Sequence, residues 1–413
     1  MRIVYLNPCG QLGGAETSLR ELVSSVRAAE PGWELWLVLG EDGPFADQAR
    51  ELGVQVLVAP FPPALARLGD AGNRPGLGSL IRAALGSALY GRRLARILRR
   101  LQPDIIHSNG FKMHILGAWA RPRTASLVWH IHDYPGRRRV MSRLLKRYSR
   151  RCAAAIVNSH SVAQDAKRLL PDLKVVTIYN AIDLKRFAPE GKQLDLDAMA
   201  GLSAALSGTV RVGLVGTFAR WKGQEIFLRA IAQLSPDLQV RGYIIGGPIY
   251  QTVGSQWTLD ELKDEAARLA LAGRIGFTGF VRDTSAAMRS LDIVVHASTQ
   301  PEPFGMVIIE GMACGKAVIA SQAGGASELF VDGVNALGHP PGDVAALAEQ
   351  IQKLVRNEQL RKELGETARE IVKRSYHGER LAKLLLTLYR QAHTGQIEGE
   401  PTVMPAPQRA EHG

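Results

Sequence analysis

Two glutamates, Glu302 and Glu310, stand eight residues apart across the expected start of a helix. A helix is predicted from Met306 to Cys314, between two apolar strand patterns. An ionised carboxylate accepts hydrogen bonds through two oxygens, which suits the paired hydroxyls of a vicinal diol. A helix that begins near Gly305 directs backbone N–H groups and the positive end of its dipole outward, which favours a phosphate. The two acids could therefore hold the two diols that flank the diphosphate of a nucleotide sugar.

A second reading of the same residues stays open. Glu302 could be a surface loop residue, and Glu310 could be a solvated residue on the helix. The neighbours of Glu310 argue against this reading, because they are apolar and an acid among them requires a polar partner. These neighbours are Val307, Ile308, Ile309 and Met312.

Two cations follow the apolar strand pattern that begins at Val210. Arg220 and Lys222 stand where this strand turns into a helix, a position at which proteins often bind phosphate. Together they could neutralise a departing diphosphate, although two solvated loop cations would have the same sequence.

Two motifs in the first half of the chain also follow strand patterns. Gly13 and Gly14 allow a tight turn whose amides could approach a phosphate or sugar, and a purely structural turn is the alternative. The spacing is not G-x-G-x-x-G, which argues against a dinucleotide site. His130 and His132 end another strand, where a histidine could bind a ligand or be purely structural. No further metal ligand is apparent beside them.

Residues 301–320 resemble the E-x7-E signature of glycosyltransferase family 4, which comprises retaining enzymes of the GT-B fold. The agreement extends to Gly324-Gly325 and Glu328 after the next strand. The Gly-Gly-Ala-Glu motif that begins at Gly13 and the segment 180–189 are similar to the donor loop and the interdomain linker of this family. The resemblance covers essentially residues 1–391.

This resemblance implies a role for each candidate residue. Lys222 matches the family lysine at the diphosphate, whereas Thr217 stands where the family has arginine, so Arg220 is the candidate replacement. Glu310 would hold the ribose, Glu302 the donor sugar, and His132 would touch that sugar from the first domain. The implied catalytic residues are Glu302, Lys222, Arg220 and His132. The implied donor-binding residues are Gly13, Gly14, Gly216, Phe280, Phe304, Gly305, Met306, Val307 and Glu310.

The net charge of +12 is concentrated in the first half of the chain. Residues 1–186 hold 28 lysines and arginines against 14 acids, and the remainder holds 23 against 25. One basic run lies in an amphipathic helix predicted for Leu77–Leu101, which fits either an anionic membrane surface or an ordinary surface helix. The basic runs contain few aromatic residues, so no nucleic-acid partner is expected. Three dispersed cysteines and the absence of a leader or membrane-span pattern predict a cytoplasmic protein.

Strand and helix patterns alternate along the chain, which predicts an α/β fold with parallel sheets. With the family resemblance, we expect a GT-B architecture of two doubly wound, Rossmann-like domains that face a central cleft. The expected acceptor-side domain is 1–186, with a helix at 376–393 packed back onto it. The expected nucleotide-sugar domain is 187–375, and a disordered tail is expected at 394–413.

The sequence thus predicts a retaining glycosyltransferase, a hexosyltransferase of class EC 2.4. It would use a nucleotide-diphosphate sugar and a sugar or lipid-linked hydroxyl acceptor, in polysaccharide or cell-envelope biosynthesis. No cofactor or metal is expected, and the leaving phosphate would take the acceptor proton. The enzyme would be cytoplasmic, or peripheral at the inner face of the cell membrane. A nucleotide-sugar epimerase or hydrolase, and a non-catalytic partner of a glycosyltransferase, are the alternatives.

Overall fold

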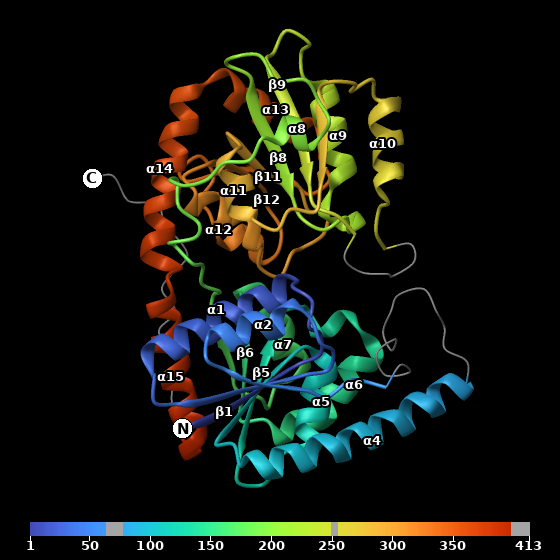
Figure 1. Ribbon diagram of the computed structural model, residues 1–413, viewed down its shortest axis with the longest axis vertical. Coiled ribbons are helices and arrows are strands. Elements are labelled where there is room, and N and C mark those ends of the chain that lie inside the picture. The colour runs from blue at the N-terminus through green and yellow to red at the C-terminus, as the bar shows by residue number, and fades with distance from the viewer. Residues whose placement is uncertain (63–76, 249–254, 398–413) are drawn as a thin grey trace. The chain divides into compact units, whose positions relative to one another are not determined.

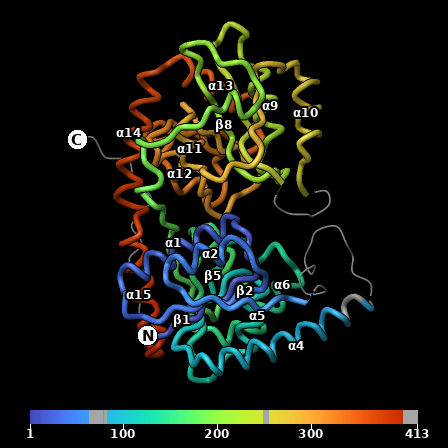
Figure 2. The backbone as a smooth tube through the Cα atoms, in the orientation of Figure 1, coloured from blue at the N-terminus to red at the C-terminus, as the bar shows by residue number. Residues whose placement is uncertain are grey.

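The computed structural model describes residues 1–62, 77–248 and 255–397, and these form two compact units. Unit 1 combines Met1–Ala181 with the segment that begins at Gly378, and unit 2 runs from Ile182 to His377. Figure 2 allows the chain to be followed as it leaves unit 1 and later returns to it. The tail predicted at 394–413 lies, from residue 398 onward, outside the described residues.

Unit 1 is built on a seven-stranded parallel sheet with the order β3-β2-β1-β4-β5-β6-β7 (Figure 1). Its strands are β1 (Arg2–Asn7), β2 (Glu34–Leu39), β3 (Gln55–Val58), β4 (Ile105–Asn109), β5 (Ser126–Ile131), β6 (Ala154–Val157) and β7 (Val175–Thr177). Its α-helices are α1 (Gly14–Ala29), α2 (Pro44–Glu51), α4 (Leu77–Leu101), α5 (Phe111–Ala120), α6 (Arg139–Tyr148), α7 (His160–Leu169) and α15 (Gly378–Thr394).

The two faces of this sheet are covered by different helices. Successive side chains of β1 point to opposite faces, as in any strand. Ile3 and Tyr5 pack into a core with α1, α2 and α15, whereas Val4 and Leu6 pack into a second core with α4, α5, α6 and α7. Because both faces are buried, the strands are nearly continuous apolar runs, which is why the sequence identifies them.

Unit 2 is built on a six-stranded parallel sheet with the order β10-β9-β8-β11-β12-β13. Its strands are β8 (Val210–Val215), β9 (Val240–Ile245), β10 (Ile275–Gly279), β11 (Ile293–His296), β12 (Ala317–Ser321) and β13 (Leu337–His339). Its α-helices are α8 (Leu196–Met199), α9 (Gln224–Gln233), α10 (Leu259–Arg268), α11 (Thr284–Arg289), α12 (Met306–Ala313), α13 (Val344–Arg356) and α14 (Glu358–Ser375).

The prediction of two doubly wound α/β sheets is confirmed. The sequence does not predict β13, because Leu337-Gly-His339 contains a single apolar side chain and forms no strand pattern. In unit 2, β8 lies between β9 and β11, so the strand order reverses at β8: the chain runs outward on one side from β8 to β10 and on the other side from β11 to β13. Parallel sheets bind ligands outside the carboxyl ends of strands at such a reversal of order. The loops that follow β8 and β11 carry Lys222 and Glu302, respectively.

Candidate functional site

Glu302 is the most deeply buried of the predicted site acids, with 6% of its surface exposed. It lies in the loop between β11 and α12, and its backbone is fixed by the loop after β12. Its carbonyl accepts a 2.7 Å hydrogen bond from the amide of Gly325, and Glu302 forms an isolated parallel bridge with Gly324. The Gly-Gly motif noted in the sequence therefore positions the backbone of the acid.

The carboxylate of Glu302 is held by Lys222, His296 and Ser298. Lys222 forms an ion pair with Oε1. On the other oxygen, Oε2, His296 Nε2 lies at 2.6 Å and the hydroxyl of Ser298 donates at 2.5 Å. Burial alone would raise the pKa of Glu302, but the charge of Lys222 and the interactions with His296 outweigh it and hold the pKa well below 4.5. Glu302 is therefore ionised at neutral pH.

His296 is oriented by the strand beside it. The backbone amide of Ser321, at the end of β12, lies 3.3 Å from His296 Nδ1 and donates to it. A neutral imidazole that accepts at Nδ1 carries its proton on Nε2, which is the nitrogen that faces Glu302. The adjacent strands β11 and β12 thus fix a histidine whose N–H is directed at the carboxylate.

Lys222 reaches Glu302 because the loops after β8 and β11 are joined to each other. The amide of Thr299 donates to the carbonyl of Trp221 at 2.8 Å. Gly223 follows directly and adopts φ +81°, a left-handed conformation that favours glycine. A Cβ at Gly223 would overlap the carbonyl oxygen of Ala297, so this close approach of the two loops also requires glycine.

Arg220 has different partners from Lys222, although both lie in the same short 3-10 turn. Its guanidinium donates to Glu261 at 2.7 Å and stacks over Trp257, 3.8 Å from the ring centroid. Its backbone amide bonds to Ser255. The structure therefore brings Lys222 together with Glu302, whereas the side chain of Arg220 contacts Glu261 and Trp257.

The remaining donor-binding candidates of unit 2 surround α12 and two neighbouring turns. Gly305 precedes α12 with φ +102°, and Phe304 is buried edge-on against Tyr376, with the ring centroids 6.4 Å apart. Met306, Val307 and Glu310 are half-buried on α12. Gly216 directly follows β8, and its carbonyl occupies the space that a Cβ on Gly246 would need. Phe280 follows β10 and is 64% exposed.

In unit 1, the Gly13-Gly14 turn is held by Glu16. The amide of Gly13 donates to the Glu16 carboxylate at 3.2 Å, and Asn7, at the end of β1, donates to its other oxygen at 3.3 Å. Burial raises the pKa of Glu16. A Cβ on Gly14 would meet no atom within 4 Å, so space remains beside this turn.

His132 directly follows β5 and lies against His130, with the ring centroids 3.9 Å apart and the ring planes tilted by 39°. The two histidines lie on the same face, as the alternation of strand residues predicts. Burial lowers the pKa of His132 to about 4, so the imidazole is neutral at pH 7. Its Nε2 is buried without a hydrogen-bond partner among the described residues.

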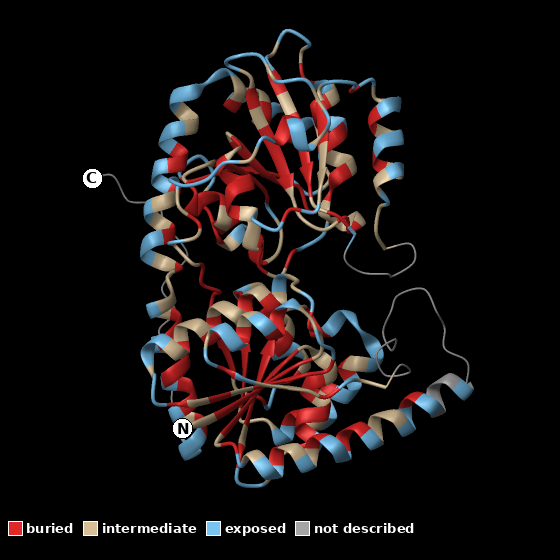
Figure 3. Ribbon diagram, viewed as in Figure 1, coloured by how far each residue is buried: buried red, intermediate tan, exposed pale blue. Residues whose placement is uncertain are grey.

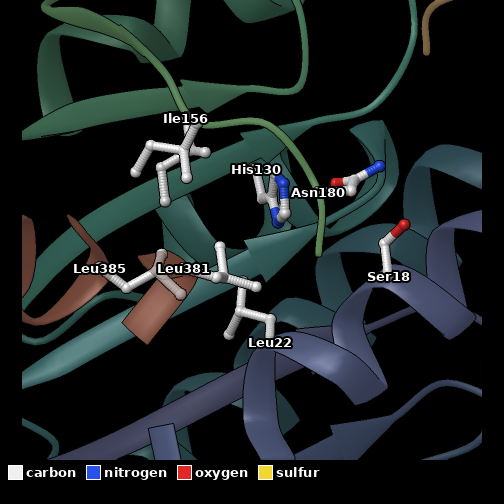
Figure 4. A pocket seen from close by; sticks show the side chains of 8 residues that line it. Ser18, Leu22, His130, Ile156, Asn180, Leu381 and Leu385 are labelled. Atoms are coloured by element: carbon white, nitrogen blue, oxygen red, sulfur yellow. The ribbon is translucent and has the colours of Figure 1, made fainter. Parts of the chain in front are cut away.

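A buried polar chain continues from His130 into unit 1. His130 Nδ1 lies 3.3 Å from Nε2 of His107, whose Nδ1 lies 2.8 Å from the hydroxyl of Tyr389 on α15. Figure 4 shows His130 and Asn180 beside a hollow that is otherwise lined mainly by aliphatic side chains. Burial lowers the pKa of His107 to about 3, which makes this chain a neutral structural network.

His296 and Ser298 are not among the site residues predicted from the sequence. The only signal for them was a histidine at the end of a predicted strand six residues before Glu302, and this does not show which way its ring points. Within residues 1–62, 77–248 and 255–397, no group of three or more His, Cys, Asp or Glu side chains is arranged to hold a metal ion. Unit 2 therefore presents an ionised carboxylate and an ammonium group at the carboxyl ends of two adjacent strands, an arrangement suited to a ligand with both hydroxyl and phosphate groups.

Comparisons with known proteins agree with this geometry. Residues 12–186 match the model described as Glycosyltransferase Family 4, and residues 206–371 match Glycosyl transferases group 1. The crystal structure of HepE from Anabaena in complex with UDP is similar, with 26% identity, a TM-score of 0.77 and coverage of 95% of this chain and 100% of that one. A HepE complex with UDP-glucose has 27% identity and a TM-score of 0.74, over the same shares of the two chains.

Similarity to curated relatives extends over shorter segments. A lipopolysaccharide core biosynthesis mannosyltransferase, LpcC of Rhizobium leguminosarum, is 31% identical over 212 residues, which are 51% of this chain and 58% of that protein. A D-inositol 3-phosphate glycosyltransferase of Corynebacterium urealyticum is 28% identical over 256 residues, 61% of this chain and 59% of that protein. The chain thus spans about half the length of the curated relatives that it matches.

Proposed function

The chain belongs to glycosyltransferase family 4, and from this premise we propose that it transfers a sugar from a nucleotide-diphosphate sugar to a hydroxyl acceptor with retention of configuration. The observation that carries the proposal is the ion pair between Lys222 and the buried carboxylate of Glu302, at the carboxyl ends of β8 and β11. A donor with a diphosphate and a sugar offers a partner to each member of that pair.

Lys222 is proposed to bind the diphosphate. Its side chain is 23% exposed, so it can exchange a carboxylate partner for a phosphate. Negative charge develops on the diphosphate as the glycosidic bond breaks, and a fixed cation there stabilises the transition state. The first amides of α12, at Gly305 and Met306, would add hydrogen-bond donors. In this mechanism Lys222 supplies the counter-charge, and we propose that no metal ion or other cofactor is required.

Glu302 is proposed to bind hydroxyls of the donor sugar, and Glu310 those of the ribose. Glu302 is suited to orientation because His296, Ser298 and the backbone of Gly325 already fix it. Prearranged groups lose little entropy when the ligand binds. Arg220, stacked on Trp257, would contribute positive potential from the same turn as Lys222. The departing phosphate would accept the proton of the acceptor hydroxyl.

Unit 1 is proposed to bind the acceptor and to contribute His132 and the Gly13-Gly14 turn to binding of the donor. The neutral imidazole of His132 can donate or accept a hydrogen bond to a sugar without adding charge, and the Gly13-Gly14 turn has space for a ligand beside it. The similarity to LpcC and its stated role in lipopolysaccharide core biosynthesis supports a lipid-linked or other cell-envelope acceptor. The enzyme would then work in the cytoplasm at the inner face of the cell membrane.

A ligand panel tests the donor site. Thermal unfolding is measured with UDP, GDP, ADP and CDP and with their common sugar conjugates, for the wild type and for Lys222→Ala. Ligand at about 100 times its dissociation constant should stabilise the wild type by about 2.7 kcal/mol. Lys222→Ala should lose this shift, whereas the control Lys263→Ala, which removes an exposed lysine on α10, should keep it. Equal shifts in all three proteins would refute the role of Lys222.

Product analysis then separates transfer from the other reactions of a nucleotide sugar. The donor identified by the panel is incubated with membrane extract, and the products are resolved by mass spectrometry. A glycosylated acceptor whose new linkage keeps the anomeric configuration, as determined by NMR, supports the proposal. Free sugar or an epimerised donor as the sole product would contradict it.

A further inference from the structure

Positive charge is concentrated in one continuous part of unit 1. Residues 71–164 contain 18 lysines and arginines but only two acids, Asp104 and Asp133. Asp133 is paired with Arg138, at 3.3 Å, and Asp104 accepts from the backbone amide of Arg2. The acids within residues 71–164 are therefore too few to neutralise the cations of this segment. Unpaired charge of one sign points to a partner of the opposite sign.

The helix α4 displays these cations on one stripe together with large apolar side chains. Its 25 residues contain no acid. Leu85 and Leu89 are 61% and 63% exposed and stand one turn apart. Arg92, Arg96 and Arg100 continue the same face at helical spacing, and all three are exposed. The opposite face packs into the core of unit 1. The helix thus has an exposed face of leucine followed by arginine.

The helix α6 repeats this combination. Val140 is 73% exposed and Leu144, one turn later, is 38% exposed. Arg143 and Arg147 flank the pair on the same face, and both are exposed. Leu145 points the other way, into the core. Two separate helices therefore share a surface in which exposed aliphatic side chains adjoin exposed arginines.

The two exposed faces belong to the same side of unit 1. Both α4 and α6 pack against α5, and all three helices contribute to the core on one face of the sheet. Trp119, at the end of α5, lies so close to α4 that a Cβ on Gly91 would overlap its ring, and it is 38% exposed. Exposed positions recur along the part of α4 whose burial is shown in Figure 3, from Arg82 to the end of the helix. The outer side of this helical layer, defined by α4, Trp119 and α6, is called the basic–apolar face below.

We propose that the basic–apolar face docks unit 1 onto an anionic lipid bilayer. Arginine binds lipid phosphates through several donors at once, and exposed leucine and valine can enter the boundary between headgroups and acyl chains. Nucleic acid would account for the arginines but not for exposed aliphatic pairs, since bases stack on aromatic rings. A solvated helix would mix charges of both signs. No helix within the described residues is long and apolar enough to cross a membrane.

The proposal rests on the proposed function in one respect: a lipid-linked acceptor gives the docking a purpose. It is tested independently by co-sedimentation of the full chain with vesicles. One set contains phosphatidylcholine alone, and in the other phosphatidylglycerol replaces part of it. Each exposed cation near an anionic surface adds to binding, and the contribution falls with salt. Binding should therefore require phosphatidylglycerol and should weaken at least about tenfold between low and high salt.

Two sets of variants separate charge from insertion. Arg92→Gln/Arg96→Gln/Arg100→Gln should lower the binding to anionic vesicles at least about tenfold, because three headgroup contacts are lost. Leu85→Gln/Leu89→Gln should lower it by a similar factor while keeping the charge. Matched controls remove exposed residues of the same kinds from unit 2: Lys263→Gln/Lys353→Gln/Lys362→Gln for charge, and Leu206→Gln/Met199→Gln for apolar surface. The controls should bind vesicles like the wild type.

Circular dichroism and the nucleotide-induced thermal shift are measured for every variant. Neither readout should change in the α4 variants, because none of these residues belongs to the donor site. If docking fails while nucleotide binding persists, the proposed function survives without this inference. Equal binding to neutral and anionic vesicles, equal losses in the unit 2 controls, or no binding to any vesicle would overturn the proposal. Preferential binding of a single-stranded oligonucleotide, measured by fluorescence anisotropy, would also overturn it.

Discussion

The substitution Lys222→Met would show how strongly the two loops of the candidate site are coupled. Methionine keeps most of the length of lysine but removes its charge, so Glu302 would remain buried as an ionised group beside His296 and Ser298. Removal of one partner from a buried pair typically costs 3–5 kcal/mol. Because the lysine side chain is 23% exposed, we expect the lower end, about 3 kcal/mol of unfolding free energy at pH 7.

A double-mutant cycle isolates the interaction itself. Urea unfolding, followed by circular dichroism, is compared for the wild type, Lys222→Met, Glu302→Gln and the double variant. Glutamine cannot form an ion pair, so Lys222→Met should cost much less in that background, and the interaction energy should be about 2 kcal/mol. An equal cost of Lys222→Met in both backgrounds would mean that the pair contributes no interaction energy, and the reasoning from burial would be wrong.

Three further outcomes are expected from the same site. The pKa of Glu302 is held below its ordinary value of 4.5, so its stabilising contribution is complete above pH 4.5 and is lost as the pH falls through the folded-state pKa. The stability advantage of the wild type over Glu302→Gln, measured by urea unfolding, should therefore shrink below about pH 4.5. His296→Phe removes one of the groups that lower this pKa, so acid unfolding should begin at a higher pH than in the wild type. Gly223→Ala places a Cβ against the carbonyl of Ala297, at a position whose φ is positive. The free energy of unfolding, measured by thermal unfolding, should fall by at least about 2 kcal/mol. A variant as stable as the wild type would contradict the close approach of the loops.

The sheets are predictable because their physical signal is local. A parallel strand buried on both faces must be apolar along its length, so segments such as Ile293–His296 stand out in the sequence. The strand β13 has three residues, and Leu337-Gly-His339 carries no comparable pattern. The order of the strands is set by pairing between distant segments and is not contained in the pattern of any single one.

The candidate site is predictable only in part, because its contacts join distant segments. The types and positions of Lys222 and Glu302 indicate a diphosphate and a diol, but no local pattern shows that they form an ion pair across 80 residues. His296 is a strand residue by sequence, and only the register of β11 with β12 directs its ring at the acid. By sequence, Arg220 is a candidate for binding phosphate just as Lys222 is. In the structure its side chain is held instead by Trp257 and Glu261.

The pairing of Lys222 with Glu302 has a consequence for recognition of the donor. A nucleoside diphosphate that binds Lys222 must first separate the lysine from Glu302. The buried carboxylate then loses its partner, which costs binding free energy. A nucleotide sugar takes Lys222 as well, but its hydroxyls can replace the ammonium at Glu302 and offset this cost. Discrimination between the two ligands should therefore depend on Glu302.

Calorimetric titration can measure this dependence with the nucleotide that the ligand panel identifies. In Glu302→Gln no carboxylate competes for Lys222, so the free diphosphate should bind at least as tightly as it does to the wild type. The preference for the sugar conjugate over the diphosphate should fall about tenfold or more, because a charged hydrogen-bond acceptor is lost. Weaker binding of both ligands by the same factor would show that Glu302 acts on the diphosphate instead. A buried ion pair contributes little to stability compared with a well-packed apolar pair. Its presence at the carboxyl ends of these two strands would be explained if Glu302, once it has released Lys222, distinguishes the nucleotide sugar from the free diphosphate.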